Sequence, residues 1–577
     1  MSDERIVEVP KERFAPWLME PMRRNKGIYI KVALAAALIN MFALLTSIFT
    51  MVVYDRVLPN NATSSLIALS IGLAIVILFD FALKTLRAYF VDVAGARIDR
   101  EVGETVFAQL LAIRLDQKKG STGALAGVIR ELETLRDFFA SATLTAVVDV
   151  PFIFITLGVI ALIGGWVVAV PLIMIPLVVL VGIVTQPMMD RLAAQAMGQG
   201  LLKQTVLVET IGGLETVKTS GAAPILTDRW LGAVEEHSGT SMRQRLVANI
   251  GVTIAGSAQT ISYAGVVIIG VGMIADNTLT MGGLIACSIL SGRAVAPLGQ
   301  IATLLSRMTA TRTAYRQLNG LMNTGTEGPD GEPLVLTATQ GKIEFRNVHF
   351  RYPGSPEKAL EGVTFTLQPG EHCALLGRVG SGKSTIARLL LGLYEPEEGV
   401  ILLDGTDIRQ LDPLDLRRKV GSAMQESILI SGSVRENIAL GRHGIGDDEM
   451  IAAAELSGTH QFMGQIANGY DRRLADRGEG LSGGQRQSIA IARALATKPT
   501  VLVFDEPTSA MDQQTESGLL DRLERELKDR TFLVITHRTP LLRLVTRVII
   551  VDRGKIIADG PRDQILAKLN RPKVAAV

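Results

Sequence analysis

Residues 377–384 read Gly-Arg-Val-Gly-Ser-Gly-Lys-Ser, which is the spacing of a phosphate-binding loop. The glycines let the backbone approach an anion without obstruction, so its N–H groups and the start of the next helix can hold phosphate. Lys383 adds a positive charge, and the Ser384 hydroxyl can ligate Mg²⁺. A strand-like run before the loop and a helix-like run after it, at 385–393, provide the context that this motif requires.

A second group of chemically suitable residues follows at 501–506, Val-Leu-Val-Phe-Asp-Glu. Asp505 emerges from the apolar strand-like run and can hold the same Mg²⁺, while Glu506 can orient an attacking water. Just ahead, residues 481–485 read Leu-Ser-Gly-Gly-Gln. Alone this could be a glycine turn, but beside the other two motifs it predicts an ATP-hydrolysing unit.

Composition predicts that this unit is only part of the protein. The chain has 577 residues, of which 48% are hydrophobic, so we expect more than one domain and a membrane part. The net charge of +2 gives no general nucleic-acid footprint, and no nucleic-acid partner is predicted. Cys287 and Cys373 have no metal-type neighbours, so we expect packing roles and no disulfide or zinc.

The N-terminal half carries long uncharged stretches. Residues 32–53 are 22 residues without a charge, roughly 33 Å as a helix, which matches the hydrocarbon thickness of a membrane. Lys and Arg gather before the first stretch, after the second and after the fourth, which predicts that both termini are cytoplasmic. The six expected spans lie at about 32–53, 64–83, 141–163, 166–186, 249–275 and 279–304.

Two long connections, 84–140 and 187–248, have helical patterning and are expected to extend the membrane helices into the cytoplasm. Charges within or beside spans are costly, and we favour interhelical pairing over substrate contact for the three found there, Asp80, Asp149 and Arg293.

The chain is thus expected to be a multi-domain membrane protein. A six-helix all-α transmembrane domain would precede an α/β nucleotide-binding domain that begins where short β-branched runs appear. A segment rich in Gly and Pro forms the natural linker between them. The predicted parts are a cytoplasmic N-terminal segment at 1–30, the membrane domain at 31–322, the linker at 323–340 and the nucleotide-binding domain at 341–570.

Six spans fused to such an ATPase resemble the ABC exporter half-transporters, over nearly the whole chain from about residue 30. The resemblance implies that Glu506 and His537 are catalytic and that Ser384, Gln425 and Asp505 serve Mg²⁺. It also implies that residues 475–480 contact coupling helices and that residues 509–512 cross a dimer interface. The ATP-binding set that it implies is Tyr352, Gly377, Gly380, Ser381, Gly382, Lys383, Ser384, Thr385, Gln425, Ser482, Gly483, Gly484, Gln485 and Asp512.

In this family the 481–485 motif closes over the ATP of a partner, and every ATP-handling position is intact here, so the resemblance implies a homodimer. Within the exporters, residues 53–60, 130–137, 149–152 and 291–300 look like bacterial type I protein secretion transporters. This implies an ATP-driven inner-membrane exporter of unfolded polypeptides. Its expected partners are a periplasmic membrane fusion adaptor, an outer-membrane channel protein, the secreted polypeptide and membrane lipids.

Many relatives in that group carry a peptidase-like domain before the first span, but roughly 30 residues cannot fold into one, so cleavage of a substrate leader is not expected. The alternative within transporters is export of lipid, small peptide or drug, because fold does not fix cargo. A soluble ABC ATPase acting on DNA or ribosomes is a third reading, and the six expected spans argue strongly against it.

Overall fold

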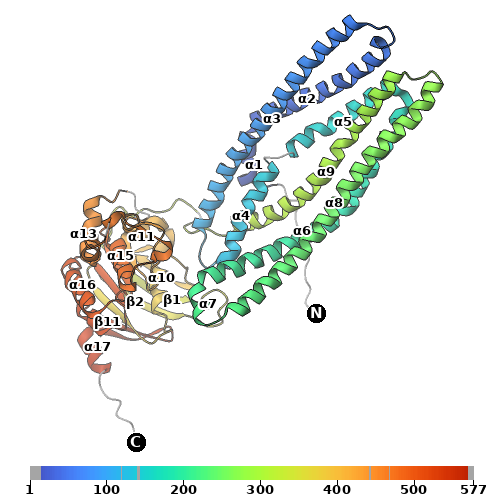
Figure 1. Ribbon diagram of the computed structural model, residues 1–577. Coiled ribbons are helices and arrows are strands. Elements are labelled where there is room, and N and C mark those ends of the chain that lie inside the picture. The colour runs from blue at the N-terminus through green and yellow to red at the C-terminus, as the bar shows by residue number, and fades with distance from the viewer. Residues whose placement is uncertain are drawn as a thin grey trace, which may run out of the picture. The chain divides into compact units, whose positions relative to one another are not determined.

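The computed structural model describes residues 14–118, 120–139, 143–329, 331–440, 444–466 and 468–569. The chain divides into two compact units, one helical and one of mixed helices and strands (Figure 1). The first unit comprises Met1–Leu111 and Lys119–Thr324, and the second comprises Ala112–Lys118 and Gly325–Val577.

The first unit consists of helices that are long compared with a membrane. Helix α8 has 53 residues, about 80 Å of length, whereas the hydrocarbon core is about 30 Å thick. Both connections that were expected to be helical extensions are indeed largely helical. The helices are α1 (Pro16–Arg24), α2 (Lys26–Val52), the π-helix η1 (Val53–Val57), α3 (Thr63–Ala112), α4 (Thr122–Phe139), α5 (Thr143–Gly164), the 3₁₀ turn η2 (Gly165–Val168), α6 (Ala169–Gly212), α7 (Leu214–Thr219), α8 (Ala223–Ala275) and α9 (Met281–Met322).

Five helical stretches among the described residues are long and apolar enough to cross a membrane. One of them, Val150–Gly212, contains part of the expected span 141–163 and all of the span 166–186, because α5 and α6 are joined by the short turn η2 and not by a loop. Gly165 in that turn has φ +54°, a conformation that glycine adopts without steric cost. The count of six spans stays a prediction. The five stretches are Lys26–Val57, Thr63–Ala112, Val150–Gly212, Ala223–Ala275 and Met281–Gly299.

Charged side chains in the apolar helices have partners within the chain. Asp80 forms an ion pair with Lys84 one turn along α3, at 2.6 Å. Arg293 of α9 donates to the backbone carbonyl of Ala43 in α2. The Arg293 contact joins two helices, as expected, whereas the Asp80 ion pair lies within α3 and so differs from the interhelical pairing expected for it. The side chain of Asp149 lies outside the described part of the structure.

The second unit is built on a six-stranded sheet of order β12-β11-β3-β10-β9-β6, with a separate four-stranded antiparallel sheet of order β2-β1-β4-β5. In the larger sheet all neighbours are parallel except β11 and β12. The strands are β1 (Ile343–Phe350), β2 (Leu360–Leu367), β3 (His372–Leu376), β4 (Glu398–Leu403), β5 (Thr406–Asp407), β6 (Val420–Ala423), β7 (Gly432–Ser433), β8 (Arg473–Leu474), β9 (Val501–Asp505), β10 (Thr531–Ile535), β11 (Arg547–Asp552) and β12 (Lys555–Pro561).

The central strands β9 and β10 are buried along their whole length, as expected for parallel strands covered on both faces. Their carboxyl ends meet those of β3 and β6 at one edge of the sheet, where ligands of open α/β sheets bind. The helices of this unit are α10 (Lys383–Leu390), α11 (Pro413–Lys419), α12 (Val434–Ile438), α13 (Asp447–Ser457), α14 (Thr459–Met463), α15 (Gly483–Leu495), α16 (Gln513–Glu526) and α17 (Arg562–Leu569).

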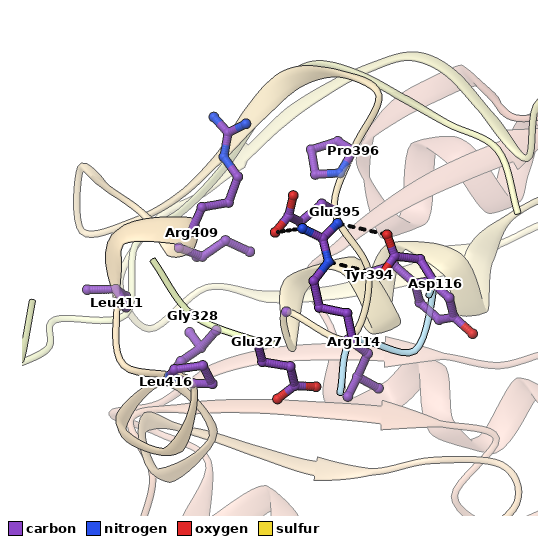
Figure 2. Close-up of a pocket in the computed structure, with 14 residues that line it drawn as sticks. Arg114, Asp116, Glu327, Gly328, Tyr394, Glu395, Pro396, Arg409, Leu411 and Leu416 are labelled. Atoms are coloured by element: carbon purple, nitrogen blue, oxygen red, sulfur yellow. Dashed lines mark hydrogen bonds and ion pairs between the residues drawn. The ribbon is translucent and has the colours of Figure 1, made fainter. Parts of the chain in front are cut away.

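The short segment Ala112–Lys118, which follows α3 in the chain, belongs to this second unit. Ile113 forms an antiparallel bridge with Thr326, and Arg114 pairs with Glu395 at 2.9 Å (Figure 2). Glu327, one residue beyond the bridge, pairs with Arg417 at 2.7 Å. Residues 325–327 of the expected linker are therefore held in place by both backbone and charge.

Candidate active site

The phosphate-binding loop connects the end of β3 to the start of α10, and two of its glycines have no room for a side chain. An ideal Cβ on Gly377 would lie 2.0 Å from the carbonyl oxygen of Val551. One on Gly382 would lie 2.5 Å from the carbonyl oxygen of Ala359. Gly382 also has φ +99°, in the left-handed region, as the residue that precedes α10. Tertiary packing, as well as anion access, thus requires glycine at these positions.

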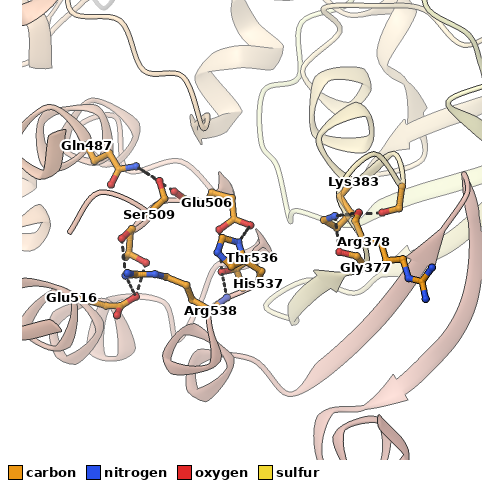
Figure 3. Close-up of polar contacts among 12 residues, drawn as sticks. Gly377, Arg378, Lys383, Gln487, Glu506, Ser509, Glu516, Thr536, His537 and Arg538 are labelled. Atoms are coloured by element: carbon orange, nitrogen blue, oxygen red, sulfur yellow. Dashed lines mark hydrogen bonds and ion pairs between the residues drawn. The ribbon is translucent and has the colours of Figure 1, made fainter. Parts of the chain in front are cut away.

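The Lys383 ammonium lies over this loop. Its Nζ donates to the carbonyl oxygens of Gly377 at 2.9 Å and Arg378 at 2.7 Å (Figure 3). Burial holds the pKa of Lys383 below its ordinary value, while the nearby charges of Glu506 and Asp505 act in the opposite direction. The positive charge is thus placed at the loop, where it can attract a phosphate.

Asp505 and Ser384 meet beside the loop. The Ser384 hydroxyl lies close enough to Asp505 to interact with its carboxylate, which is almost fully buried. Burial holds the pKa of Asp505 above its ordinary value, and the interaction with the Ser384 hydroxyl opposes this shift. The Oδ1 atom of Asp505 is buried without a hydrogen-bond partner among the described residues. An orphaned carboxylate oxygen next to a hydroxyl fits Mg²⁺, which prefers oxygen ligands.

Gln425 is placed at the same edge of the sheet as that pair. It follows β6, whose last residue Ala423 pairs with Phe504 in β9. Its side chain is exposed, and no hydrogen bond joins it to Asp505 or Ser384 in the described part of the chain. Only the pairing of β6 with β9 therefore brings Gln425 near Asp505 and Ser384, the other two residues expected to bind Mg²⁺.

Glu506 comes directly after β9 and has an unusual backbone. Its φ is +49°, in the left-handed region that non-glycine residues rarely adopt, and its N–H donates to the carbonyl of Ile535 at 2.9 Å. The His537 ring, through Nδ1, donates to the Glu506 carboxylate at 2.7 Å, and the Thr536 hydroxyl lies 3.5 Å from it (Figure 3). The Glu506 side chain is 11% exposed but that of His537 is 72% exposed. Strain of this kind is typical of functional sites.

Tyr352 lies beside the helix that follows the loop. Its hydroxyl is 3.0 Å from the Thr385 hydroxyl and accepts a hydrogen bond from Arg388 at 3.0 Å. Its ring makes edge contacts with Phe350 and Tyr394. The structure thus brings the expected aromatic platform to the phosphate-binding loop.

The residues of the 481–485 motif form the start of α15. Ser482 is the N-cap, and its hydroxyl accepts from the backbone N–H of Gln485 at 3.2 Å while the Gln485 side chain accepts from the Ser482 N–H at 2.9 Å. An ideal Cβ on Gly483 would lie 2.9 Å from the side chain of Ala510, and one on Gly484 would lie 3.0 Å from the Ala510 carbonyl. The glycines therefore let α15 pack closely on the loop that precedes α16.

Asp512 caps α16 at the far end of that loop. Its carboxylate accepts from the Thr515 N–H at 2.8 Å and hydroxyl at 2.9 Å. The backbone bond from Thr515 is the main cause that lowers the pKa of Asp512 below its ordinary value. Among the described residues, no hydrogen bond joins residues 482–485 or Asp512 to residues 377–385. The structure therefore divides the expected ATP-binding set into two groups within one chain.

Sequence reasoning missed four residues that connect the loop at 509–512 to α15 and to residues beside the Glu506–His537 pair, namely Gln487, Thr508, Glu516 and Arg538. Each is a polar residue within one or two helical turns of a motif residue, or directly next to one. That proximity was the available signal, but their contacts depend on the tertiary fold.

Comparison with known proteins shows the family of the chain. The model of the ABC transporter family matches residues 360–509, and that of the ABC transporter transmembrane region matches residues 29–298. The chain is 34% identical over 558 residues to the leukotoxin translocation ATP-binding protein LktB of Pasteurella haemolytica-like sp. (strain 5943B), covering 96% of this chain and 78% of that protein. The chain belongs to the ABC transporter family.

Two further relatives agree with this assignment. The toxin RTX-I translocation ATP-binding protein of Actinobacillus pleuropneumoniae is 33% identical over 555 residues, covering 96% of this chain and 78% of that protein. A solved structure of a bacterial Atm1-family ABC exporter with ATP bound superposes with a TM-score of 0.85 and 25% identity, covering 95% of this chain and 97% of that one.

This ABC exporter half-transporter is a multi-pass membrane protein that binds ATP and couples its hydrolysis to transport. The expected fold, a helical membrane domain followed by an α/β nucleotide-binding domain, is confirmed. A half-transporter implies a dimer.

Proposed function

We propose that this ABC exporter moves unfolded polypeptides across the bacterial inner membrane as the ATP-driven component of a type I secretion system. The observation that carries the proposal is the similarity, over 96% of this chain, to proteins named for leukotoxin and RTX-I toxin translocation. It includes the membrane half, whose motif at residues 53–60 contains a π-helix. Such helices are frequent at functional sites. Asp55 in this π-helix accepts from the Thr280 hydroxyl at 2.6 Å and the Gly282 N–H at 2.8 Å, next to the start of α9.

In the proposed mechanism the loop at 377–382 and Lys383 hold the ATP phosphates, and the face of Tyr352 supports the adenine. Glu506 orients the attacking water, and His537 contacts the γ-phosphate. Ser482 to Gln485 and Asp512 close over the ATP of a second identical subunit, using the anion-binding N-terminus of α15. Closing and reopening of the two nucleotide domains would drive the membrane helices between two arrangements.

The cellular setting follows from the same proposal. The distribution of positive charges supports cytoplasmic termini, and a dimer with spans of about 30 Å would cross a single bilayer. Secretion from a cell with two membranes would then need a periplasmic membrane fusion adaptor and an outer-membrane channel. The secreted polypeptide and membrane lipids complete the proposed partners.

Mg²⁺ is proposed to be held by Ser384 and Asp505, with Gln425 contributing when the site closes. When bound, the ion would neutralise charge on the phosphates during transfer. We expect chelation of Mg²⁺ with EDTA to abolish ATP hydrolysis by the purified exporter, and added Mg²⁺ to restore it. Asp505→Asn should raise the Mg²⁺ concentration needed for half-maximal hydrolysis at least about tenfold. A wild-type Mg²⁺ requirement in Asp505→Asn would contradict this assignment.

The cargo is tested by comparing secreted proteins in the native bacterium. Deletion of the gene should trap one or a few large secreted proteins in the cell, and chromosomal Glu506→Gln should give the same phenotype with the complex still assembled. Glu524→Gln, an exposed change on α16, is the matched control and should secrete normally. An unchanged set of secreted proteins in both defective strains, with altered export of lipid or small peptides, would favour the alternative cargo class.

A further inference from the structure

The side chain of Arg538, directly after the exposed His537, is anchored in the interior of the nucleotide-binding domain. Its Nη1 lies 2.9 Å from the Glu516 carboxylate and donates to the Thr508 carbonyl at 2.8 Å (Figure 3). The Glu516 side chain is 6% exposed, and that of Arg538 is 30% exposed. A buried carboxylate of this kind has been removed from water and needs its partner.

Glu516 also holds a second segment. Its Oε1 accepts a hydrogen bond from the Thr508 hydroxyl at 2.6 Å, and Thr508 is fully buried. Thr508 and Glu516 lie on either side of the loop at 509–512. The Glu516 carboxylate thus links residues on both sides of this loop to Arg538. We call Thr508, Glu516 and Arg538 together the Arg538 clasp.

The clasp continues to the catalytic pair through short contacts. The Arg538 N–H donates to the Thr536 hydroxyl at 3.0 Å, and that hydroxyl lies 3.5 Å from the Glu506 carboxylate. Both chain neighbours of His537 are therefore held, although the His537 ring itself is largely exposed. Among the described residues the side chain and N–H of Arg538 bond to Glu516, Thr508 and Thr536.

Gln487 ties helix α15 to the same loop. Its Nε2 donates to the Ser509 hydroxyl at 2.7 Å and lies 3.4 Å from the Glu506 carbonyl, while its Oε1 accepts from the Ala510 N–H at 2.9 Å. Gln487 of α15, Glu516 of α16 and Arg538 after β10 thus all bond to residues 508–510 in or beside the loop at 509–512. A displacement of the loop at 509–512 would therefore be expected to move Glu506 and His537 of the same chain.

We propose that Arg538, held by Glu516, is a positioning residue for ATP hydrolysis: it fixes the Glu506–His537 pair relative to the loop at 509–512. The inference rests on the proposed catalytic roles of Glu506 and His537. It adds a mechanical link between the loop expected to face the second subunit and the catalytic pair of the first.

The test measures ATP turnover and the KM for ATP with the full-length exporter in detergent or liposomes. Arg538→Met removes the charge and keeps much of the side-chain length. It should lower kcat about 10- to 100-fold, because misplacement of catalytic groups by about 1 Å has effects of this size, while KM changes less than about threefold. Arg538→Lys should recover part of kcat, because an ammonium can still pair with Glu516.

Glu516→Gln and the double variant Arg538→Met/Glu516→Gln test whether the clasp acts as a unit. The two single changes should lower kcat to a similar degree, and the double variant should be little worse than either, because coupled residues are not additive. Full additivity of the two effects on kcat would overturn the inference.

Arg547→Met is the matched control for lost stability. Arg547 lies in the same domain with similar exposure and pairs with Asp559 at 2.6 Å and with Glu371 at 3.0 Å, and neither ion pair contacts the loop at 509–512 or the catalytic pair. It should lower the melting temperature without lowering the kcat of folded protein. A kcat for Arg538→Met within twofold of wild type, or an equal kcat loss in Arg547→Met, would overturn the inference.

If the proposed catalytic roles of Glu506 and His537 were wrong, the variants would give a different result. In that case Glu506→Gln and His537→Ala would themselves keep wild-type turnover. Loss of turnover in those two variants, together with normal turnover in Arg538→Met and Glu516→Gln, would leave the catalytic roles in place and reject the clasp alone.

Discussion

Glu506→Gln is expected to bind ATP with nearly unchanged affinity and to hydrolyse it about 10² to 10⁴ times more slowly. Glutamine keeps the size of the side chain and can stay in the same buried place, but it cannot accept a proton from the attacking water, and general-base catalysis contributes a factor of this size. The structure adds a second reason, since the amide would lose the charge that attracts the His537 ring at 2.7 Å. ATP would then accumulate in a closed dimer.

Single-turnover hydrolysis and equilibrium nucleotide binding, measured on the same preparation, separate the two effects. Glu524→Gln makes the same chemical change at an exposed position of α16 and should hydrolyse ATP normally. Turnover by Glu506→Gln close to that of wild type would show that another group orients the water.

Gly377→Ala is expected to be as damaging, for a steric reason. The new methyl group would lie 2.0 Å from the Val551 carbonyl oxygen, which belongs to the backbone of the buried strand β11 and cannot move without disturbing the sheet. Overpacking and backbone strain together should lower the free energy of unfolding of the nucleotide-binding domain by about 2 to 4 kcal/mol. Because the same shift would displace the loop, ATP binding should weaken at least tenfold.

Gly380→Ala provides a matched comparison within the same loop. Gly380 has φ +79°, but an ideal Cβ there would meet nothing within 4 Å. Only the conformational preference of alanine opposes this change, so the cost should be about 1 kcal/mol with a smaller effect on ATP binding. The melting temperature should therefore fall in the order wild type, Gly380→Ala, Gly377→Ala. The dissociation constant for ATP should rise in the same order. Equal effects of the two alanines would show that contact with Val551 is not the decisive factor.

Much of the nucleotide site could be predicted from local sequence. Residues 377–384 and 501–506 combine a strand, a turn and specific side chains within a few residues, so their function depends little on distant contacts. The contact between Glu506 and His537 joins residues 31 positions apart, and it needs β9 and β10 to pair in register, Asp505 with Ile535. Family resemblance supplied a catalytic role for His537, but neither it nor residue spacing predicted the contact with Glu506.

The supporting contacts could not be predicted in this way. Arg538 pairs with Glu516, and Arg114 with Glu395, across separations at which hydrophobic periodicity carries no information. Charged residues at these positions look the same in sequence as residues of a solvated surface. The close approach of Gly483 to Ala510 was likewise hidden, because a glycine in a phosphate-related motif already has a sufficient explanation.

The nucleotide-binding unit is discontinuous in sequence, since Ala112–Lys118 belongs to it as well as the chain from Gly325 onward. A protein fragment that starts at the linker would thus lack one piece of its own surface. Glu395 would lose the guanidinium of Arg114, and residues 325–327 would lose the backbone partners that order them. ATPase rates measured on such a fragment would come from a domain that lacks the contacts of residues 112–118. A synthetic peptide of residues 112–118 could restore these contacts.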